Sequence, residues 1–138
     1  MQMSVSENLL ARAARANKRI VFPEGADPRV VAAAYRIAER KLGRPVLIGE
    51  PAEFDRARRA GHFPEPGFPV VAWCEGLEED ADLLVEIRRR KNLSREDALK
   101  LATDPLFKAA LMVRTGKADA CVGGAVRTTA DTSKARAP

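Results

Sequence analysis

Short apolar runs alternate along this chain with segments whose apolar residues recur every three or four positions. The short runs predict buried strands, and the periodic segments predict helices. The expected strands are 19–25, 44–50, 70–73 and 119–124. The expected helices are 6–18, 27–43, 52–61, 78–92, 94–102 and 104–118. This order predicts an α/β fold: one doubly wound domain over residues 1–138, with a mainly parallel sheet and helices on both faces.

Several helix ends carry local signals. In the first helix, Leu9 and Leu10 begin an apolar face, and Gly43 should end the helix that begins near residue 27. Residues with short polar side chains precede the helical segments and should act as N-caps. They are Ser6, Asp27, Ser94 and Asp104. The strand, helix and strand within 19–50 form a βαβ unit, which requires parallel strands.

The composition excludes several classes of protein. The 138 residues are 46% apolar, enough for a core, but no stretch has the roughly 18 consecutive apolar residues of a membrane span. The N-terminus lacks the apolar segment of a signal peptide, so we expect a cytoplasmic protein without a membrane partner. His62 is the only histidine, which excludes a histidine-based metal cluster and a Ser-His-Asp triad within this chain. Cys74 and Cys121 should be small buried residues.

The positive charge indicates an anionic partner without identifying it. The formal net charge is +5, and the densest basic run is "EIRRRK" at residues 86–91. This run lacks interleaved aromatic residues for base stacking, and no nucleic-acid-binding signature occurs, so a nucleic-acid partner would rest on charge alone. The run is either a solvated helix face or the position of a phosphate-binding arginine.

A second candidate anion site follows the last predicted strand, in "CVGGAVRTTADT". Ligands of parallel sheets bind beyond the carboxyl ends of the strands, and glycines allow a close approach to the backbone. Free N–H groups at the start of a following helix would attract an anion. Thr128, Thr129 and Thr132 would add hydroxyl donors. A turn followed by a helix cap explains the same residues, and the segment is neither a Walker loop nor a Rossmann fingerprint.

Five segments together resemble one known family. They are "RIVFPEGADPRVVAAA", "PVLIGE", "EIRRRKNLSREDA", "DPLFKAALMV" and "GKADACVGGAVRTTADT". In this order they resemble the N-terminal part of the phosphate acetyl/butyryltransferase family, which includes phosphate acetyltransferases. The resemblance implies reversible acetyl transfer between acetyl-CoA and phosphate, giving acetyl phosphate and CoA. CoA is then a substrate, no separate cofactor or metal is needed, and a homo-oligomer, most simply a dimer, is expected.

The resemblance also implies site residues. The family motif Gly-Ala-x-His-Ser-Thr-Ala-Asp-Thr-x-Arg falls on residues 124–134, with Arg127 at the histidine position. A lysine replaces the arginine of the motif, so a point charge stands where a planar guanidinium could hold two phosphate oxygens. A second functional arginine of the family aligns within the basic run. The implied residues on the phosphate and CoA side are Arg88, Thr128, Thr129, Asp131, Thr132 and Lys134.

The resemblance covers only the first part of the family's length. The family's second domain, with the expected base, a serine and a further arginine, is absent, so a complete catalytic set is not expected and the chain alone should be inactive. The tail "SKARAP" also differs from the family's apolar helix. A truncated gene, a frameshift or a deliberately shortened chain would each give such an end. The alternative is a non-catalytic α/β module that binds phosphate-bearing ligands or a partner protein.

Overall fold

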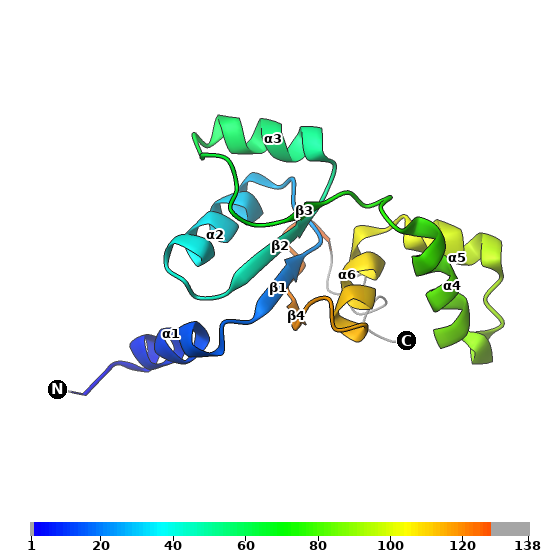
Figure 1. The fold of residues 1–138 in the computed structure, drawn as a ribbon, viewed down its shortest axis with the longest axis horizontal. Helices are drawn as coiled ribbons and strands as arrows, with labels where there is room; N and C mark the ends of the chain where they lie inside the picture. Colours follow the sequence, from blue (N-terminus) through cyan, green and yellow to red (C-terminus); the bar gives the residue numbers. More distant parts are fainter. Residues whose placement is uncertain (1, 128–138) are drawn as a thin grey trace.

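The computed structural model describes residues 2–127, and these contain one parallel sheet with its strands in the order β3-β2-β1-β4 (Figure 1). The strands are β1 (Arg19–Phe22), β2 (Arg44–Ile48), β3 (Val70–Val71) and β4 (Ala120–Cys121). The helices are α1 (Val5–Ala16), α2 (Pro28–Glu39), α3 (Pro51–Ala60), α4 (Leu77–Ile87), α5 (Arg95–Ala102) and α6 (Pro105–Arg114), with a 3-10 turn η1 (Arg89–Lys91).

Helices cover both faces of the sheet, as the sequence pattern predicts. Successive side chains of a strand point to opposite faces, and the last two residues of β1 and the last four of β2 are buried. Phe22 and Leu47 pack on one face with apolar residues of α2 and α3. Val21 and Val46 pack on the other face with Ala109 of α6. The α/β/α layering is therefore confirmed.

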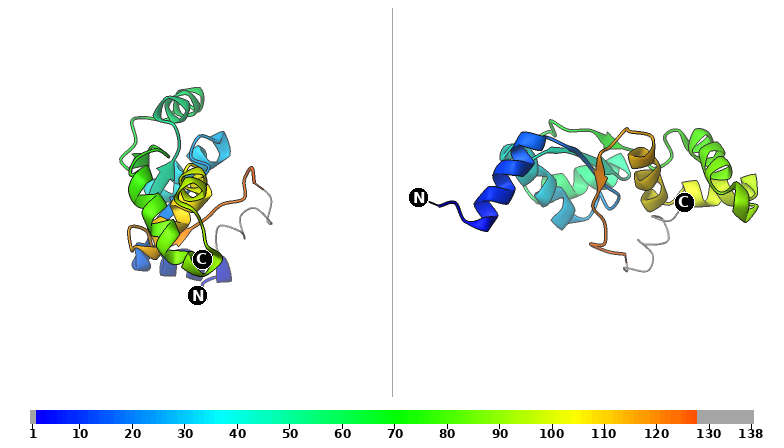
Figure 2. Two further views of the ribbon diagram at one scale, coloured as in Figure 1. Left: turned by 90° about the vertical axis from the view of Figure 1, so that its right-hand side faces the viewer. Right: turned by 90° about the horizontal axis from the view of Figure 1, so that it is seen from below.

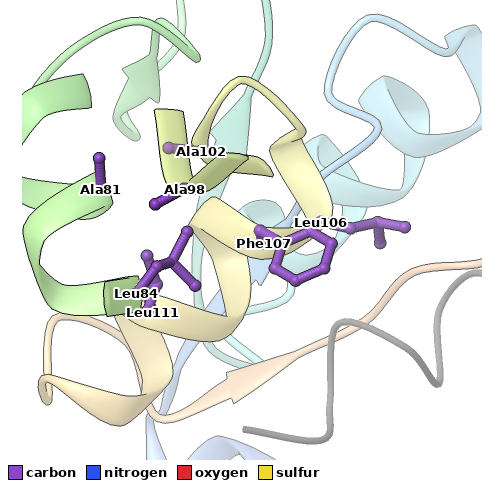
Figure 3. Close-up of a cluster of buried hydrophobic side chains, with 7 residues drawn as sticks. All are labelled: Ala81, Leu84, Ala98, Ala102, Leu106, Phe107 and Leu111. Carbon is purple, nitrogen blue, oxygen red and sulfur yellow. The ribbon is translucent and has the colours of Figure 1, made fainter. Parts of the chain in front are cut away.

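A third core lies beside the sheet, where α4 and α5 pack on α6 (Figure 3). Leu84 of α4, Ala98 of α5 and Phe107 of α6 belong to this cluster. Lys108 of α6 is also buried, and its Nζ donates to Asp80 Oδ2 of α4 at 2.8 Å. Helix α6 thus contacts the sheet on one side and the α4–α5 pair on the other.

The N-cap predictions were right for three of the four helices, with one correction. Asp27, Ser94 and Asp104 each accept a backbone N–H of the first turn that they cap. The first helix is capped by Ser4 instead of Ser6, because Ser4 forms a reciprocal capping box with Glu7.

All four strands and most of the helices end before the predicted residues. The helix predicted to end at residue 92 ends at Ile87 and is followed by η1. Helix α2 ends at Glu39, before Gly43, because Arg40 and Lys41 already leave the helical conformation and Lys41 has φ +53°. The strands β3 and β4 have two residues each, shorter than the predicted runs 70–73 and 119–124, because only those residues find ladder partners.

The prediction that both cysteines are buried was wrong. Cys74 and Cys121 are exposed, because Cys74 lies in the turn after β3 and Cys121 lies on β4, which ends the sheet among the described strands.

Helix α1 has no buried residue and Leu9 is 56% exposed, so the apolar face of α1 contacts little of the described chain. Figure 2 shows α1 at one end of the elongated molecule and α4 and α5 at the other. Within residues 2–127, every helix is too short or too polar to cross a membrane.

Candidate functional site

The order of the strands creates a switch point between β1 and β4. From β1 the chain moves outward through β2 to β3, and it then returns to the opposite side of β1 to form β4. In open parallel sheets, ligands bind at the carboxyl ends of the strands where the direction of winding reverses. The loop after β1, residues 23–27, and the loop after β4, residues 122–127, meet at this point.

A cleft of about 540 Å³ opens at these carboxyl ends. It is lined by the loops that follow β1, β2 and β3, by the start of α6 and by the loop after β4. Trp73 contributes an aromatic wall, and Arg127 is the only cationic side chain among its described lining residues. Several carboxylates also line the cleft, so the net charge of the cleft depends on which of these carboxylates are paired with an arginine. They are Glu24, Asp27, Glu50, Glu53 and Asp104.

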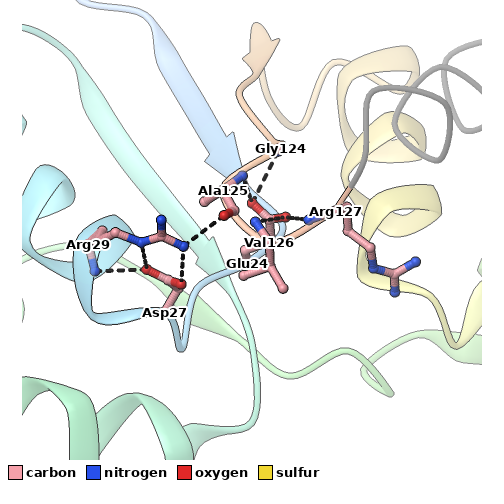
Figure 4. A network of polar contacts seen from close by, with 7 residues as sticks. All are labelled: Glu24, Asp27, Arg29, Gly124, Ala125, Val126 and Arg127. Atoms are coloured by element: carbon pink, nitrogen blue, oxygen red, sulfur yellow. Dashed lines mark hydrogen bonds and ion pairs between the residues drawn. The ribbon is translucent and has the colours of Figure 1, made fainter.

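The carboxylate of Glu24 binds four consecutive backbone N–H groups of the loop after β4 (Figure 4). Its Oε2 accepts from Gly124 at 3.1 Å and from Ala125 at 2.7 Å. Its Oε1 accepts from Val126 at 3.0 Å and from Arg127 at 2.9 Å. Successive N–H groups that converge in this way form an anion-binding nest. The loop therefore does hold an anion, and that anion is the chain's own carboxylate.

The two glycines of "CVGG" have different roles in this loop. A Cβ on Gly123 would lie 3.2 Å from Pro23 Cγ and 3.4 Å from Leu106 Cδ2, so a side chain there would press against the loop after β1 and against α6. Gly124 has φ +103°, a conformation that residues with a side chain rarely adopt. The first glycine thus allows close packing, and the second allows the turn that brings the four N–H groups together.

Two arginines hold the same loop from opposite sides. Arg29, at the start of α2, donates from Nη2 to the carbonyl oxygen of Ala125 at 2.7 Å, and Asp27 orients its guanidinium through contacts of 3.1 and 2.9 Å. Arg127 reaches in the other direction, and its Nη1 and Nη2 donate to the two carboxylate oxygens of Asp104 at 3.1 and 3.2 Å. The loop is consequently tied to both helices that flank the switch point.

The electrostatics of the site favour ionised carboxylates. Partial burial acts against ionisation of Glu24, but the four N–H donors outweigh it and lower its pKa below the ordinary 4.5. The side-chain hydrogen bond from Arg29 lowers the pKa of Asp27, against a smaller opposing effect of desolvation. Both groups therefore stay charged at neutral pH, as their contacts with N–H donors require.

Arg88 is the one predicted site residue that lies within the described part of the chain. It caps the C-terminus of α4, and its Cζ lies 5.1 Å from the centre of the Phe107 ring, a cation–π contact. Phe107 follows Asp104 by three residues, so Arg88 and Arg127 contact the same first turns of α6. The other predicted site residues lie outside the described residues; they are Thr128, Thr129, Asp131, Thr132 and Lys134.

The sequence analysis missed Glu24, Arg29 and Asp104 as residues of this site. The one available signal for Glu24 was its position in "PEG", directly after a buried strand, where functional residues of parallel sheets gather. Asp104 was predicted only as a cap, and the structure shows that the same carboxylate both caps α6 and pairs with Arg127.

Comparison with known proteins assigns the chain to a family. Residues 4–137 match the sequence pattern of the family described as "Phosphate acetyl/butaryl transferase". The chain is 37% identical over 132 residues to a phosphate acetyltransferase of Acetivibrio thermocellus, covering 94% of this chain and 39% of that protein. It is 39% identical over 121 residues to the phosphate acetyltransferase of Escherichia coli, covering 87% of this chain and 17% of that protein.

Solved structures give the same result. A phosphotransacetylase from Streptococcus pyogenes superposes with a TM-score of 0.85 and 31% identity, covering 96% of this chain and 42% of that chain. A phosphotransacetylase from Staphylococcus aureus superposes with a TM-score of 0.82 and 26% identity, covering 93% of this chain and 40% of that chain. The present sequence thus spans less than half the length of each of these relatives.

Proposed function

The chain belongs to the phosphate acetyl/butaryl transferase family, and we propose that it forms the phosphate-side wall of a phosphate acetyltransferase. The reaction is reversible acetyl transfer between acetyl-CoA and inorganic phosphate, which yields acetyl phosphate and CoA. The observation that carries the proposal is the clamped loop after β4, because it lies at the switch point and leads directly into residues 128–134. CoA acts as a substrate in this reaction.

The proposed chemistry needs fixed positive charge and hydrogen-bond donors. Acyl transfer to phosphate passes through a crowded anionic tetrahedral state, and preorganised donors stabilise it better than water that must reorganise. Arg88 is proposed to bind phosphate from the α4 side, and its packing on Phe107 gives the guanidinium a rigid support. The remaining proposed contacts follow the loop in sequence: Thr128, Thr129, Asp131, Thr132 and Lys134.

Acetyl transfer should also need groups from the part of the relatives that this sequence does not span. An ordinary thiol has a pKa of about 8.5, so attack by CoA at neutral pH is helped greatly by a positioned base. The resemblance places that base outside these residues. A polypeptide of these 138 residues is therefore expected to bind phosphate weakly and to transfer acetyl groups at no more than a residual rate.

Phosphate titration followed by ¹H–¹⁵N correlation spectra tests the binding. We expect saturable shifts at Arg88 and in residues 128–134, and weaker binding in Arg88→Ala. The matched control is Arg90→Ala, which removes an exposed arginine from the same basic run. Equal phosphate affinities for the two variants would contradict the role of Arg88, and unchanged spectra of the wild-type chain would contradict the phosphate site.

An activity assay tests the second part of the proposal. The 138-residue chain is mixed with CoA and acetyl phosphate, and acetyl-CoA is followed by its thioester absorbance, with a full-length relative as positive control. Turnover close to that of the relative, abolished by Arg88→Ala, would show that copies of this chain assemble a working site by themselves.

The family resemblance also supports a homodimer in the cytoplasm as part of the proposal. Exposed apolar side chains on α1 and after β4, among them Leu9 and Val122, offer surface for association. Sedimentation that shows a strictly monomeric chain at high concentration would count against the dimer.

A further inference from the structure

We propose that Glu24 is a positioning residue, whose carboxylate occupies the backbone nest of residues 124–127 and thereby fixes the loop after β4, from which the proposed phosphate-binding residues 128–134 continue. The identity of the ligand in this inference rests on the proposed function. The occupancy of the nest does not, because the contacts of Glu24 show it directly.

The first step is that the nest is filled. All four N–H groups point to one carboxylate, two to each oxygen, at 2.7 to 3.1 Å. Hydrogen bonds to an ionised acceptor are stronger than those between neutral groups. An external phosphate would have to displace a carboxylate that is attached to the same chain. Substrate phosphate is therefore expected to bind beyond residue 127, and the nest serves as the support of that site.

The second step is that the support is rigid. Glu24 follows β1 by two residues, and the strand β1 lies between β2 and β4 in the sheet. The side chain of Glu24 thus anchors the loop after β4 to the central strand β1. Strand β4 itself has only two residues. In addition to the two ladder pairs of β4 and the contacts of Arg29 and Arg127, the four bonds to Glu24 fix the peptide N–H groups of residues 124–127.

The charges around Glu24 are arranged to keep this contact. From α2, Arg29 binds the Ala125 carbonyl and adds positive charge, while Asp27 is paired with Arg29 itself. From α6, Asp104 is paired with Arg127. Asp27 and Asp104, two of the other carboxylates that line the cleft, are thus each paired with an arginine, and the nest is occupied by Glu24.

The first experiment tests the occupancy in phosphate-free buffer. Acetate is titrated into wild type and into Glu24→Ala, and the amide signals of residues 124–127 are followed. We expect no movement in wild type. In Glu24→Ala the four signals should start from new positions and move saturably with acetate, and chloride at the same ionic strength should have no such effect. If the four signals of Glu24→Ala coincide with those of wild type, Glu24 does not occupy the nest and the inference is refuted.

The second experiment tests the positioning role with inorganic phosphate. We expect Glu24→Ala to weaken phosphate binding at residues 128–134 at least about tenfold, the factor that loss of one charged hydrogen bond can produce. Added acetate should restore the affinity, a rescue that a general loss of stability would not show. Glu24→Gln should lie between the two, because an amide offers one acceptor oxygen in place of two. Glu39→Ala, an exposed glutamate on α2, is the matched control and should bind phosphate as wild type does.

The outcomes separate this inference from the proposed function. Wild-type affinity in Glu24→Ala, with the nest signals displaced, would refute the positioning role while leaving the phosphate site intact. Absence of phosphate binding in wild type would refute the proposed function and the positioning role together, and the acetate titration would still decide what fills the nest. Circular dichroism verifies folding, and Glu24→Gln carries both measurements if Glu24→Ala does not fold.

Discussion

Replacement of Lys108 by methionine should be among the most destabilising single changes in this chain. The Lys108 side chain is only 7% exposed, and its Nζ donates to Asp80 Oδ2 at 2.8 Å and also to the backbone carbonyl of Glu75. The Asp80 side chain is 16% exposed. These contacts join the first turn of α4 to the middle of α6, so they also hold the helix that carries Arg88 in place.

The expected magnitude follows from the burial of the pair. Lys108→Met nearly keeps the length of the side chain but leaves the mostly buried Asp80 carboxylate without its counter-charge. Removing one partner of a buried pair costs about 3–5 kcal/mol of unfolding free energy. Lys100 and Glu96 form a matched exposed pair at 3.2 Å, with side chains 69% and 81% exposed, and Lys100→Met should cost at most about 0.5 kcal/mol.

Urea unfolding followed by far-UV circular dichroism measures both changes. The double variant Lys108→Met/Asp80→Asn should recover much of the loss, because it removes the stranded charge together with its partner. Equal losses for Lys108→Met and Lys100→Met would show that the buried pair contributes no more than an exposed one. No recovery in the double variant would show that the lost stability comes from packing instead of charge.

Two further predictions concern the loop after β4. Gly124→Ala should lower the unfolding free energy by about 1–2 kcal/mol, because Gly124 has φ +103°, and it should displace the amide signals of the nest. Gly67→Ala is the control, because an added Cβ there meets nothing within 4 Å, and it should change neither the unfolding free energy nor these signals. The lowered pKa of Glu24 means that its stabilising effect is complete above the unfolded value near 4.5 and is lost as the pH falls through the lower folded value. The difference in urea stability between wild type and Glu24→Gln should therefore be largest at neutral pH and shrink in acid, and a difference that stays constant with pH would contradict the assigned charge.

Local features of this protein were predictable from the sequence because their causes lie within a few residues. Asp27 caps α2 by binding the N–H of Arg29, two positions away, and Ser94 caps α5 through Asp97, three positions away. The alternation of strands and helices, and hence the layered α/β fold, follows from the same short-range spacing of apolar residues. Predictions failed where the cause was more distant: Cys121 was expected to be buried, but β4 has a strand on one side only among the described residues.

The candidate site depended on tertiary structure because its groups are far apart in the sequence. Glu24 and its four N–H partners are separated by 100 to 103 positions, and Arg127 and Asp104 by 23. The glycines of "CVGG" indicated an anion, and the sequence offered no means of telling a ligand from a side chain of the same protein. Parallel pairing of β1 with β4 decides the matter, because it brings the carboxyl ends of both strands to one edge, within reach of the Glu24 side chain.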